Sequence, residues 1–205
     1  MLAIIDYGLS NLSSISSALE YLEIESKCTN DKKIILDAKG IILPGVGSFQ
    51  KGIENLKQLN LIDTLNEQVE KKKIPILGIC LGFQLMSNIG YEGKKQKGLG
   101  WIDAETKILQ QTSTELRIPH VGWNECKRVN KSRLLNKIPE DTLFYFIHSF
   151  HVECRDQNQV VGISDHGQKF VAVFEHENIF GTQFHPEKSQ YFGLQLLKNF
   201  FDIVN

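Results

Sequence analysis

The sequence is poor in cysteine and has almost no net charge, and each shortage excludes a class of protein. The 205 residues contain four cysteines, too few and too scattered for a disulfide framework: Cys28, Cys80, Cys126 and Cys154. We therefore expect a reducing, cytoplasmic setting. The formal net charge of −1 gives no electrostatic reason to bind nucleic acid or a membrane surface.

Long hydrophobic runs, repeats and linkers are also missing. The apolar run at the N-terminus stops at Asp6, far too early for a signal peptide or a membrane span. Hydrophobic residues make up 41% and charged residues 23%, an ordinary globular composition that permits a substantial core. With no low-complexity stretch in view, we expect one domain over residues 1–205.

The first half of the chain alternates between strand and helix patterns. Short apolar runs at Leu2–Ile5, Ile41–Leu43 and Ile74–Ile79 are typical of buried strands. Apolar residues recur at helical spacing over Asn11–Leu22 and Ile53–Val69. This order predicts an α/β fold with a mostly parallel central sheet and helices on both faces.

The second half, from about Trp101, is rich in strand patterns. Leu143–His151 alternates as one strand would, and one side of it carries Phe144, Phe146, His148 and Phe150. Val160–Ser164 and Lys169–Phe174 are separated by a short polar turn, which predicts an antiparallel hairpin. A last amphipathic helix is expected over Gln190–Phe201.

The segment Gly78-Ile79-Cys80-Leu81-Gly82 joins a buried strand to a helix. This is the nucleophile-elbow pattern with cysteine in the serine position. The glycines allow a sharp turn that lifts the thiol above the sheet edge, and a helix N-terminus favours the thiolate. Cys80 is therefore a candidate nucleophile, and a buried structural cysteine is the alternative.

A candidate base for this thiol lies far along the chain. His185-Pro186-Glu187 directly follows a strand-like run that ends at Phe184. A thiol nucleophile needs a base, and the base needs an orienting group; His185 and Glu187 can fill these two roles. Only folding can bring them to Cys80, and a solvated loop histidine is the alternative.

The loop Pro44-Gly45-Val46-Gly47 follows another strand. It lacks the lysine and spacing of a phosphate-binding P-loop and the third glycine of a dinucleotide fingerprint. Its backbone N–H groups suit an oxyanion hole, with the N–H of Leu81 as the second donor. An ordinary turn at a strand end is the alternative.

His148, His151 and Cys154 have a spacing that faintly resembles a metal cluster. On one strand, residues three apart point to opposite faces, so His148 and His151 could not share an ion. We therefore predict no metal ligands, and we expect no cofactor.

The cysteine elbow, the Pro44–Gly47 loop and the His185–Glu187 segment together resemble the class I, or triad, glutamine amidotransferases. Within that group, the chain resembles the glutaminase subunits of imidazole glycerol phosphate synthase over essentially its whole length. The further segments that carry this resemblance are Asp6–Gly8 with Asn11–Leu12, Leu43–Phe49, Pro119–Asn124, Phe144–Ser149 and Gly181–Ser189.

The resemblance implies a class I glutamine amidotransferase-like fold that hydrolyses glutamine to glutamate and ammonia. The ammonia would pass to a (β/α)8-barrel cyclase subunit of a heterodimer in histidine biosynthesis. By the same resemblance, Cys80 is the nucleophile, His185 the base and Glu187 its orienter. Val46 and Leu81 would supply the oxyanion N–H groups.

Other positions match residues that hold the bound glutamine in this family: Gly47, Gln84, Glu92, Ser149 and Phe150. Glu92 would pair with the α-ammonium group, and Gln84 would hold the α-carboxylate end. A further set matches positions near the barrel interface and the ammonia passage: Asn11, Trp123, Tyr145 and Lys188.

Three other functions remain open at this stage. A paralogous subunit could feed ammonia to a related barrel that amidates a surface-polysaccharide or nucleotide-sugar precursor. A regulatory subunit without catalysis is a second alternative, although the intact Cys80, His185 and Glu187 argue against it. A free-standing cysteine hydrolase is the third.

Overall fold

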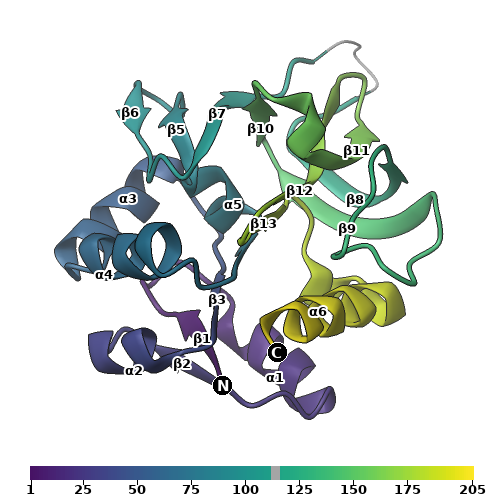
Figure 1. The fold of residues 1–205 in the computed structure, drawn as a ribbon. Coiled ribbons are helices and arrows are strands. Elements are labelled where there is room, and N and C mark those ends of the chain that lie inside the picture. Colours follow the sequence, from purple (N-terminus) through teal and green to yellow (C-terminus); the bar gives the residue numbers. More distant parts are fainter. Residues whose placement is uncertain (112–115) are drawn as a thin grey trace.

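The computed structural model describes residues 1–111 and 116–205, and its main sheet runs through the centre of the molecule (Figure 1). Within the described residues this sheet has nine strands, in the order β2 (Ser26–Thr29), β1 (Leu2–Ile5), β3 (Gly40–Leu43), β4 (Ile76–Ile79), β13 (Ile179–Thr182), β12 (Lys169–His176), β11 (Val160–Asp165), β8 (His120–Arg128) and β9 (Thr142–His148). From β2 to β13 all neighbours are parallel, and from β13 to β9 all are antiparallel. The α/β prediction with a strand-rich second half is confirmed.

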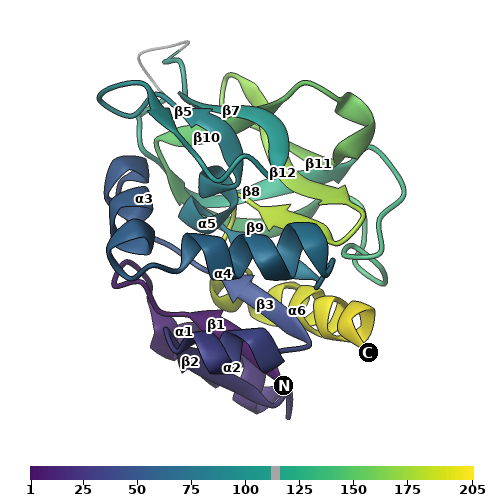
Figure 2. The same cartoon turned by 60° about the vertical axis from the view of Figure 1, so that its left-hand side comes forward.

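Helices cover both faces of the parallel half (Figure 2). α1 (Leu12–Tyr21) and α6 (Gln190–Val204) pack on one face, and α2 (Lys32–Asp37), α3 (Phe49–Gln58) and α4 (Ile62–Asn66) pack on the other. Because the strands between them are buried on both faces, they need apolar residues at every position, and the burial of all four residues of β1, β3 and β4 agrees with this.

A smaller sheet packs beside the antiparallel half, at the top of Figure 1. Its strands lie in the order β10 (Phe150–Cys154), β7 (Ile102–Ile108), β5 (Ser87–Gly90) and β6 (Gln96–Lys97). The short helix α5 (Leu81–Leu85) leads from β4 into this sheet. The remaining helical turns are η1 (Glu67–Lys71), η2 (Gln157–Gln159) and η3 (Pro186–Lys188).

The prediction of one helix over Ile53–Val69 is wrong. α3 starts earlier and ends at Gln58, and α4 begins at Ile62. Asn60 has a left-handed backbone with φ of 53°, a conformation that asparagine tolerates better than most residues. The helical period continues across this break, so the spacing of apolar residues concealed it.

The prediction of one strand over Leu143–His151 is also wrong. β9 ends at His148, and Phe150 begins β10, which belongs to the other sheet. His148 and His151 therefore lie on different strands, and the argument from opposite faces of one strand does not hold. Both imidazoles are buried, and within the described parts of the chain no group of three His, Cys, Asp or Glu side chains is placed to hold a metal ion.

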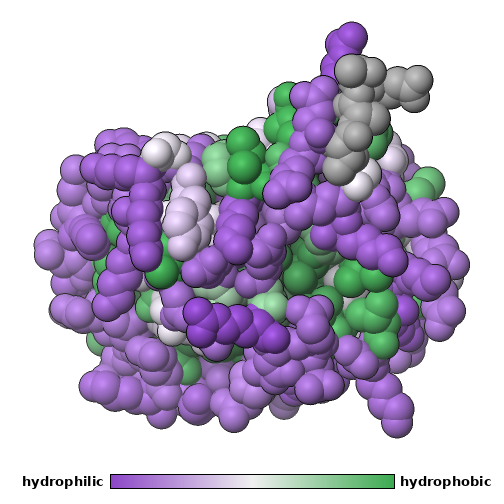
Figure 3. Space-filling view, turned by 90° about the horizontal axis from the view of Figure 1, so that it is seen from above, coloured by the Kyte–Doolittle hydropathy of each residue, from purple (hydrophilic) through white to green (hydrophobic). Residues whose placement is uncertain are grey.

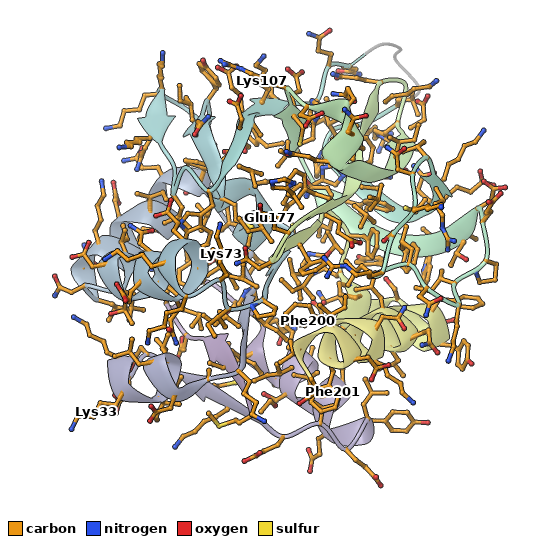
Figure 4. The ribbon with its side chains drawn as sticks, in the orientation of Figure 1. Lys33, Lys73, Lys107, Glu177, Phe200 and Phe201 are labelled. Atoms are coloured by element: carbon orange, nitrogen blue, oxygen red, sulfur yellow. The ribbon has the colours of Figure 1, made fainter. Side chains whose placement is uncertain are left out.

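The hairpin of β11 and β12 is confirmed, and so is the last helix, which continues to Val204. Figure 4 labels Phe200 of α6, whose ring is buried and packs on Phe180 of β13 with centroids 5.8 Å apart. In the same view, Lys73 and Glu177 form an exposed ion pair of 3.0 Å between the start of β4 and the turn before β13. α6 therefore packs on β13, and the ion pair links the segment before β4 to the turn before β13.

Seen from above, the surface is mainly hydrophilic, with hydrophobic side chains visible in smaller groups between the polar ones (Figure 3). None of the helices in the described ranges is long and apolar enough to pass through a lipid bilayer.

Candidate active site

The topology brings the two candidate segments to one edge of the sheet. β4 and β13 are parallel neighbours, with Ile79 paired to Thr182. Since parallel strands end at the same edge, the residues after Ile79 and those after Thr182 must lie close together. The backbone N–H of Cys80 donates to the Thr182 carbonyl at 2.7 Å, which ties the two ends together.

Cys80 occupies a strained turn between β4 and α5. Its φ of 52° and ψ of −108° lie outside the regions that residues other than glycine favour. A methyl group on Gly82 would overlap the Leu43 carbonyl oxygen, and one on Gly78 would lie 2.7 Å from the Phe83 backbone. Only glycine fits at these two places, so the nucleophile-elbow prediction is confirmed as backbone geometry. α5 spans only five residues, so its dipole is that of little more than one turn.

His185 and Glu187 form a buried pair beside this turn. His185 Nδ1 and Glu187 Oε1 are 2.8 Å apart, and each side chain is 2% exposed. The backbone N–H of His185 donates to the Tyr145 carbonyl at 2.9 Å, and Pro186 opens the turn η3. Because Nδ1 donates to Glu187, the other ring nitrogen, Nε2, is left to act as the base.

The pKa of His185 is raised by the side chains beside it, Cys80 and Glu187. Burial by itself would lower this pKa, but the Cys80 sulfur and then Glu187 outweigh burial and raise the pKa to about 10. His185 Nε2 is buried and makes no hydrogen bond of normal geometry with the described residues. His185 thus lies near enough to Cys80 for the sulfur to raise its pKa, and its role as the base stays a prediction.

A cavity of about 240 Å³ opens in front of the sulfur. Its wall includes eight of the predicted site residues and two that were not predicted: Val46, Gly47, Cys80, Leu81, Gln84, Glu92, Ser149 and Phe150, with Ile147 and His148. A larger hollow of about 640 Å³ lies beside Arg133 and Asn199, and it contains neither Cys80 nor His185. Chemistry rather than size therefore identifies the candidate site.

The two predicted oxyanion donors are both occupied. The N–H of Val46 donates to the Leu9 carbonyl at 2.7 Å, and the N–H of Leu81 donates to the Gly45 carbonyl at a long 3.3 Å. Gly47, with φ of +108°, lies in the left-handed region and gives the loop a residue able to change conformation. The oxyanion hole stays a prediction, and it requires both the Leu9–Val46 bond and the long Gly45–Leu81 bond to open.

Gln84 and Glu92 line the cavity but already have partners. The Gln84 amide nitrogen donates to the Phe150 carbonyl at 2.8 Å and to Gln183 Oε1 at 3.1 Å. Glu92 Oε2 accepts from the N–H of Phe49 at 2.6 Å, at the start of α3. Binding of a substrate carboxylate by Gln84 would require exchange of these bonds, so both predicted contacts with glutamine remain predictions.

The four residues predicted at a partner interface lie outside the cavity. Trp123 and Tyr145 are cross-strand neighbours on β8 and β9 whose rings are 6.1 Å apart at the centroids. Lys188 is exposed directly after Glu187, and Asn11 is exposed at the start of α1, which contacts η3. They thus share the side of the molecule on which the His185 segment lies.

Sequence reasoning missed two contacts of the Cys80 sulfur. The Ile147 carbonyl oxygen and the Gln183 amide nitrogen each lie 3.7 Å from Sγ. A backbone carbonyl has no residue-type signal, so Ile147 could not have been found. Gln183 carried a signal, because a polar residue in the run Ile179–Phe184 before His185 must find a buried partner.

The chain matches the model of the glutamine amidotransferase class-I family over residues 3–204. The chain belongs to this family.

Relatives within the family are similar over nearly the whole chain. The chain is 44% identical over 200 residues to imidazole glycerol phosphate synthase subunit HisH 2 of Methanococcus maripaludis, covering 98% of each chain. It is 42% identical over 204 residues to subunit HisH of Bacillus cereus, covering 100% of this chain and 95% of that one. The crystal structure of a putative GMP synthase component from Thermoplasma acidophilum has a TM-score of 0.76 at 19% identity, covering 99% of this chain and 92% of that one, which shows the common fold alone.

Proposed function

We propose that this class-I glutamine amidotransferase is the glutaminase subunit of an imidazole glycerol phosphate synthase, acting in histidine biosynthesis. It hydrolyses glutamine to glutamate and ammonia in the cytoplasm and works as a single domain. The observation that carries the proposal is the buried His185–Glu187 pair near Cys80, whose side chain lines a cavity, in a chain similar to HisH subunits over nearly its full length.

The residues support thioester chemistry. Cys80 thiolate attacks the amide carbon of glutamine, and His185 gives its proton to the departing ammonia. Water then attacks the thioester carbon, His185 takes a proton from that water, and glutamate leaves. Glu187 keeps the imidazole in the tautomer with the proton on Nδ1 and stabilises the imidazolium.

The oxyanion formed in each step needs two N–H donors. Val46 and Leu81 are the assigned donors, and in the resting chain the Leu9 and Gly45 carbonyls hold their N–H groups. We expect the isolated chain to be a weak glutaminase for this reason. Breaking these two hydrogen bonds would release the donors, and a docked partner can favour that state.

The partner we propose is a (β/α)8-barrel cyclase subunit, bound as a heterodimer with no nucleic acid or membrane involved. Ammonia needs an enclosed passage, because protonation in water destroys its nucleophilicity. The face of β8 and β9 that carries Trp123 and Tyr145 supports such docking, because apolar side chains are exposed on it. These are Val121, Trp123, Leu143 and Ile147, and Tyr191 of α6 is exposed as well.

The test is a glutaminase assay with and without the cyclase subunit of the same organism. Glutamate should form slowly with the chain alone and much faster in the complex, and Cys80→Ala should abolish both rates. Transfer of the ammonia to the nucleotide intermediate of histidine synthesis should follow. A stable complex that hydrolyses glutamine but does not use that acceptor would instead point to the sugar-amidating alternative.

A further inference from the structure

We propose that Gln183 is a further catalytic residue, whose side-chain amide donates a hydrogen bond to the Cys80 sulfur and stabilises the thiolate before glutamine arrives. This inference rests on the proposed function, because it gives Gln183 a role in the same cysteine chemistry. Gln183 lies in the Gly181–Ser189 segment. In that segment the sequence assigns catalytic roles to His185 and Glu187 and none to Gln183.

The position of Gln183 is fixed by its backbone. It directly follows β13, its N–H donates to the Ala172 carbonyl at 2.9 Å, and its side chain is completely buried. Nε2 lies 3.7 Å from Cys80 Sγ, within the range of hydrogen bonds to sulfur. Thr182, the preceding residue, holds the backbone N–H of Cys80, so the two ends of this contact cannot drift apart.

The orientation of the Gln183 amide follows from its other neighbour. Gln183 Oε1 accepts from Gln84 Nε2 at 3.1 Å, and the same nitrogen donates to the Phe150 carbonyl at 2.8 Å. A flipped Gln183 amide would place two N–H donors against each other and would turn its oxygen toward the sulfur. Gln84 therefore directs the N–H of Gln183 at Cys80.

The two contacts of the sulfur suit different protonation states. A thiol can donate its proton to the Ile147 carbonyl oxygen, whereas a thiolate has no proton to donate and is repelled by that oxygen. The Gln183 N–H can only donate, and a hydrogen bond to an ionised acceptor is about twice as strong as one to a neutral acceptor. Gln183 therefore shifts the balance toward the thiolate.

A purely structural role would not require this arrangement. Gln68 is an equally buried glutamine, and its amide nitrogen donates to the carbonyls of Ile35 and Leu36, far along the chain from the elbow. It offers a matched control, because its loss removes buried hydrogen bonds without touching Cys80.

The test is the rate of Cys80 alkylation by iodoacetamide between about pH 5 and about pH 10, followed by mass spectrometry of the peptide that contains Cys80. Gln183→Met keeps the length of the side chain but removes the N–H donor. We expect the pH midpoint of alkylation to rise by about one unit, so that the rate falls about tenfold at pH values below both midpoints. Gln68→Met should match the wild-type profile. Identical profiles for Gln183→Met and the wild type would overturn the proposal.

A second measurement needs no Gln183 variant and covers the case in which that variant does not fold. One of the Gln183 side-chain amide protons should shift downfield in NMR spectra of the wild type as Cys80 ionises, and this shift should be absent in Cys80→Ala. An amide proton chemical shift that stays the same as Cys80 ionises would count against the proposal. Neither measurement uses glutamine or a partner, so failure here is distinct from failure of the proposed function, which would appear as absent hydrolysis in the complex.

Discussion

Two buried histidines should make the folded chain sensitive to mild acid. His120 Nδ1 and His148 Nε2 are 3.0 Å apart, and His148 Nδ1 donates to the Phe150 carbonyl at 2.9 Å. When His148 is neutral, its Nε2 accepts from His120 Nδ1, and His120 Nε2 can in turn accept from the Asn124 amide nitrogen 3.3 Å away, so this arrangement suits two neutral imidazoles. Burial, followed by the neighbouring His166, lowers the pKa of His120 to about 4. The pKa of His148 falls to about 3, mainly through burial, with the nearby histidines His120, His151 and His166 lowering it and the hydrogen bond to the Phe150 carbonyl opposing them.

The sign of the effect follows from proton linkage. Both folded pKa values lie below the ordinary value of 6.5, so the unfolded chain binds more protons as the pH falls. The stability contributed by each neutral imidazole is present above about pH 6.5 and is lost toward about pH 4 and below. From about pH 7.5 to about pH 5.5, each such histidine removes about 1.4 kcal/mol from the free energy of unfolding.

Other histidines also contribute, so the test compares two chains. Burial is the main cause that lowers the pKa of His151, so this histidine also reduces stability as the pH falls. The pKa of His185 is raised, so His185 increases stability as the pH falls. His120→Asn removes one neutral imidazole and keeps an N–H that can reach His148. Between the two pH values, the variant should lose about 1.4 kcal/mol less stability than the wild type.

The assay is urea unfolding at both pH values, read by circular dichroism. His176→Asn is the matched control, because His176 is exposed on β12, and its pH dependence should follow that of the wild type. Equal pH dependence in His120→Asn and the wild type would show that His120 is not held neutral in the folded state.

Three further outcomes are expected. Glu187→Gln should lower the glutaminase rate of the complex at least about a hundredfold, because an amide cannot stabilise the imidazolium; a steady-state glutamate assay near the wild-type rate would refute this role. Gly82→Ala should reduce the free energy of unfolding by about 2 kcal/mol through overlap with the Leu43 carbonyl oxygen. Gly93→Ala meets no atom within 4 Å and is strained only by its φ of +74°, so it should lose less in the same urea titration. Trp123→Asp should weaken binding of the barrel subunit about tenfold or more in calorimetry while the chain stays folded, and unchanged affinity would place the interface elsewhere.

Hydrophobic pattern predicted most of the parallel half of the fold, but it missed β2, a partly exposed edge strand, and the short helix α2. Continuous apolar runs identified β1, β3 and β4, because strands buried on both faces need apolar residues at every position. The same pattern could not detect the break at Asn60, since a helical period passes through one left-handed residue unchanged. It also missed the change of sheet at Ser149, where alternation continues although the strand ends.

The candidate site divides in the same way. The positions of Cys80 and His185 at neighbouring strand ends were predictable because glycines and a proline mark those ends, whereas their catalytic pairing stays a prediction. The hydrogen bond between Val46 and Leu9 was not predictable, because it joins two backbone groups whose residue types carry no signal. Gln183 was visible in the sequence but had no assigned role until the sulfur was found beside it.

The left-handed backbone at Cys80 places a side chain needed for the proposed chemistry where it lowers the stability of the fold. Glycine would adopt φ of 52° and ψ of −108° with least strain, and a residue with a side chain gives up about 1–3 kcal/mol there. Cys80→Gly should therefore raise the urea midpoint while removing the nucleophile. The proposed nucleophile therefore occupies a backbone position at which the chain gives up stability to keep a side chain.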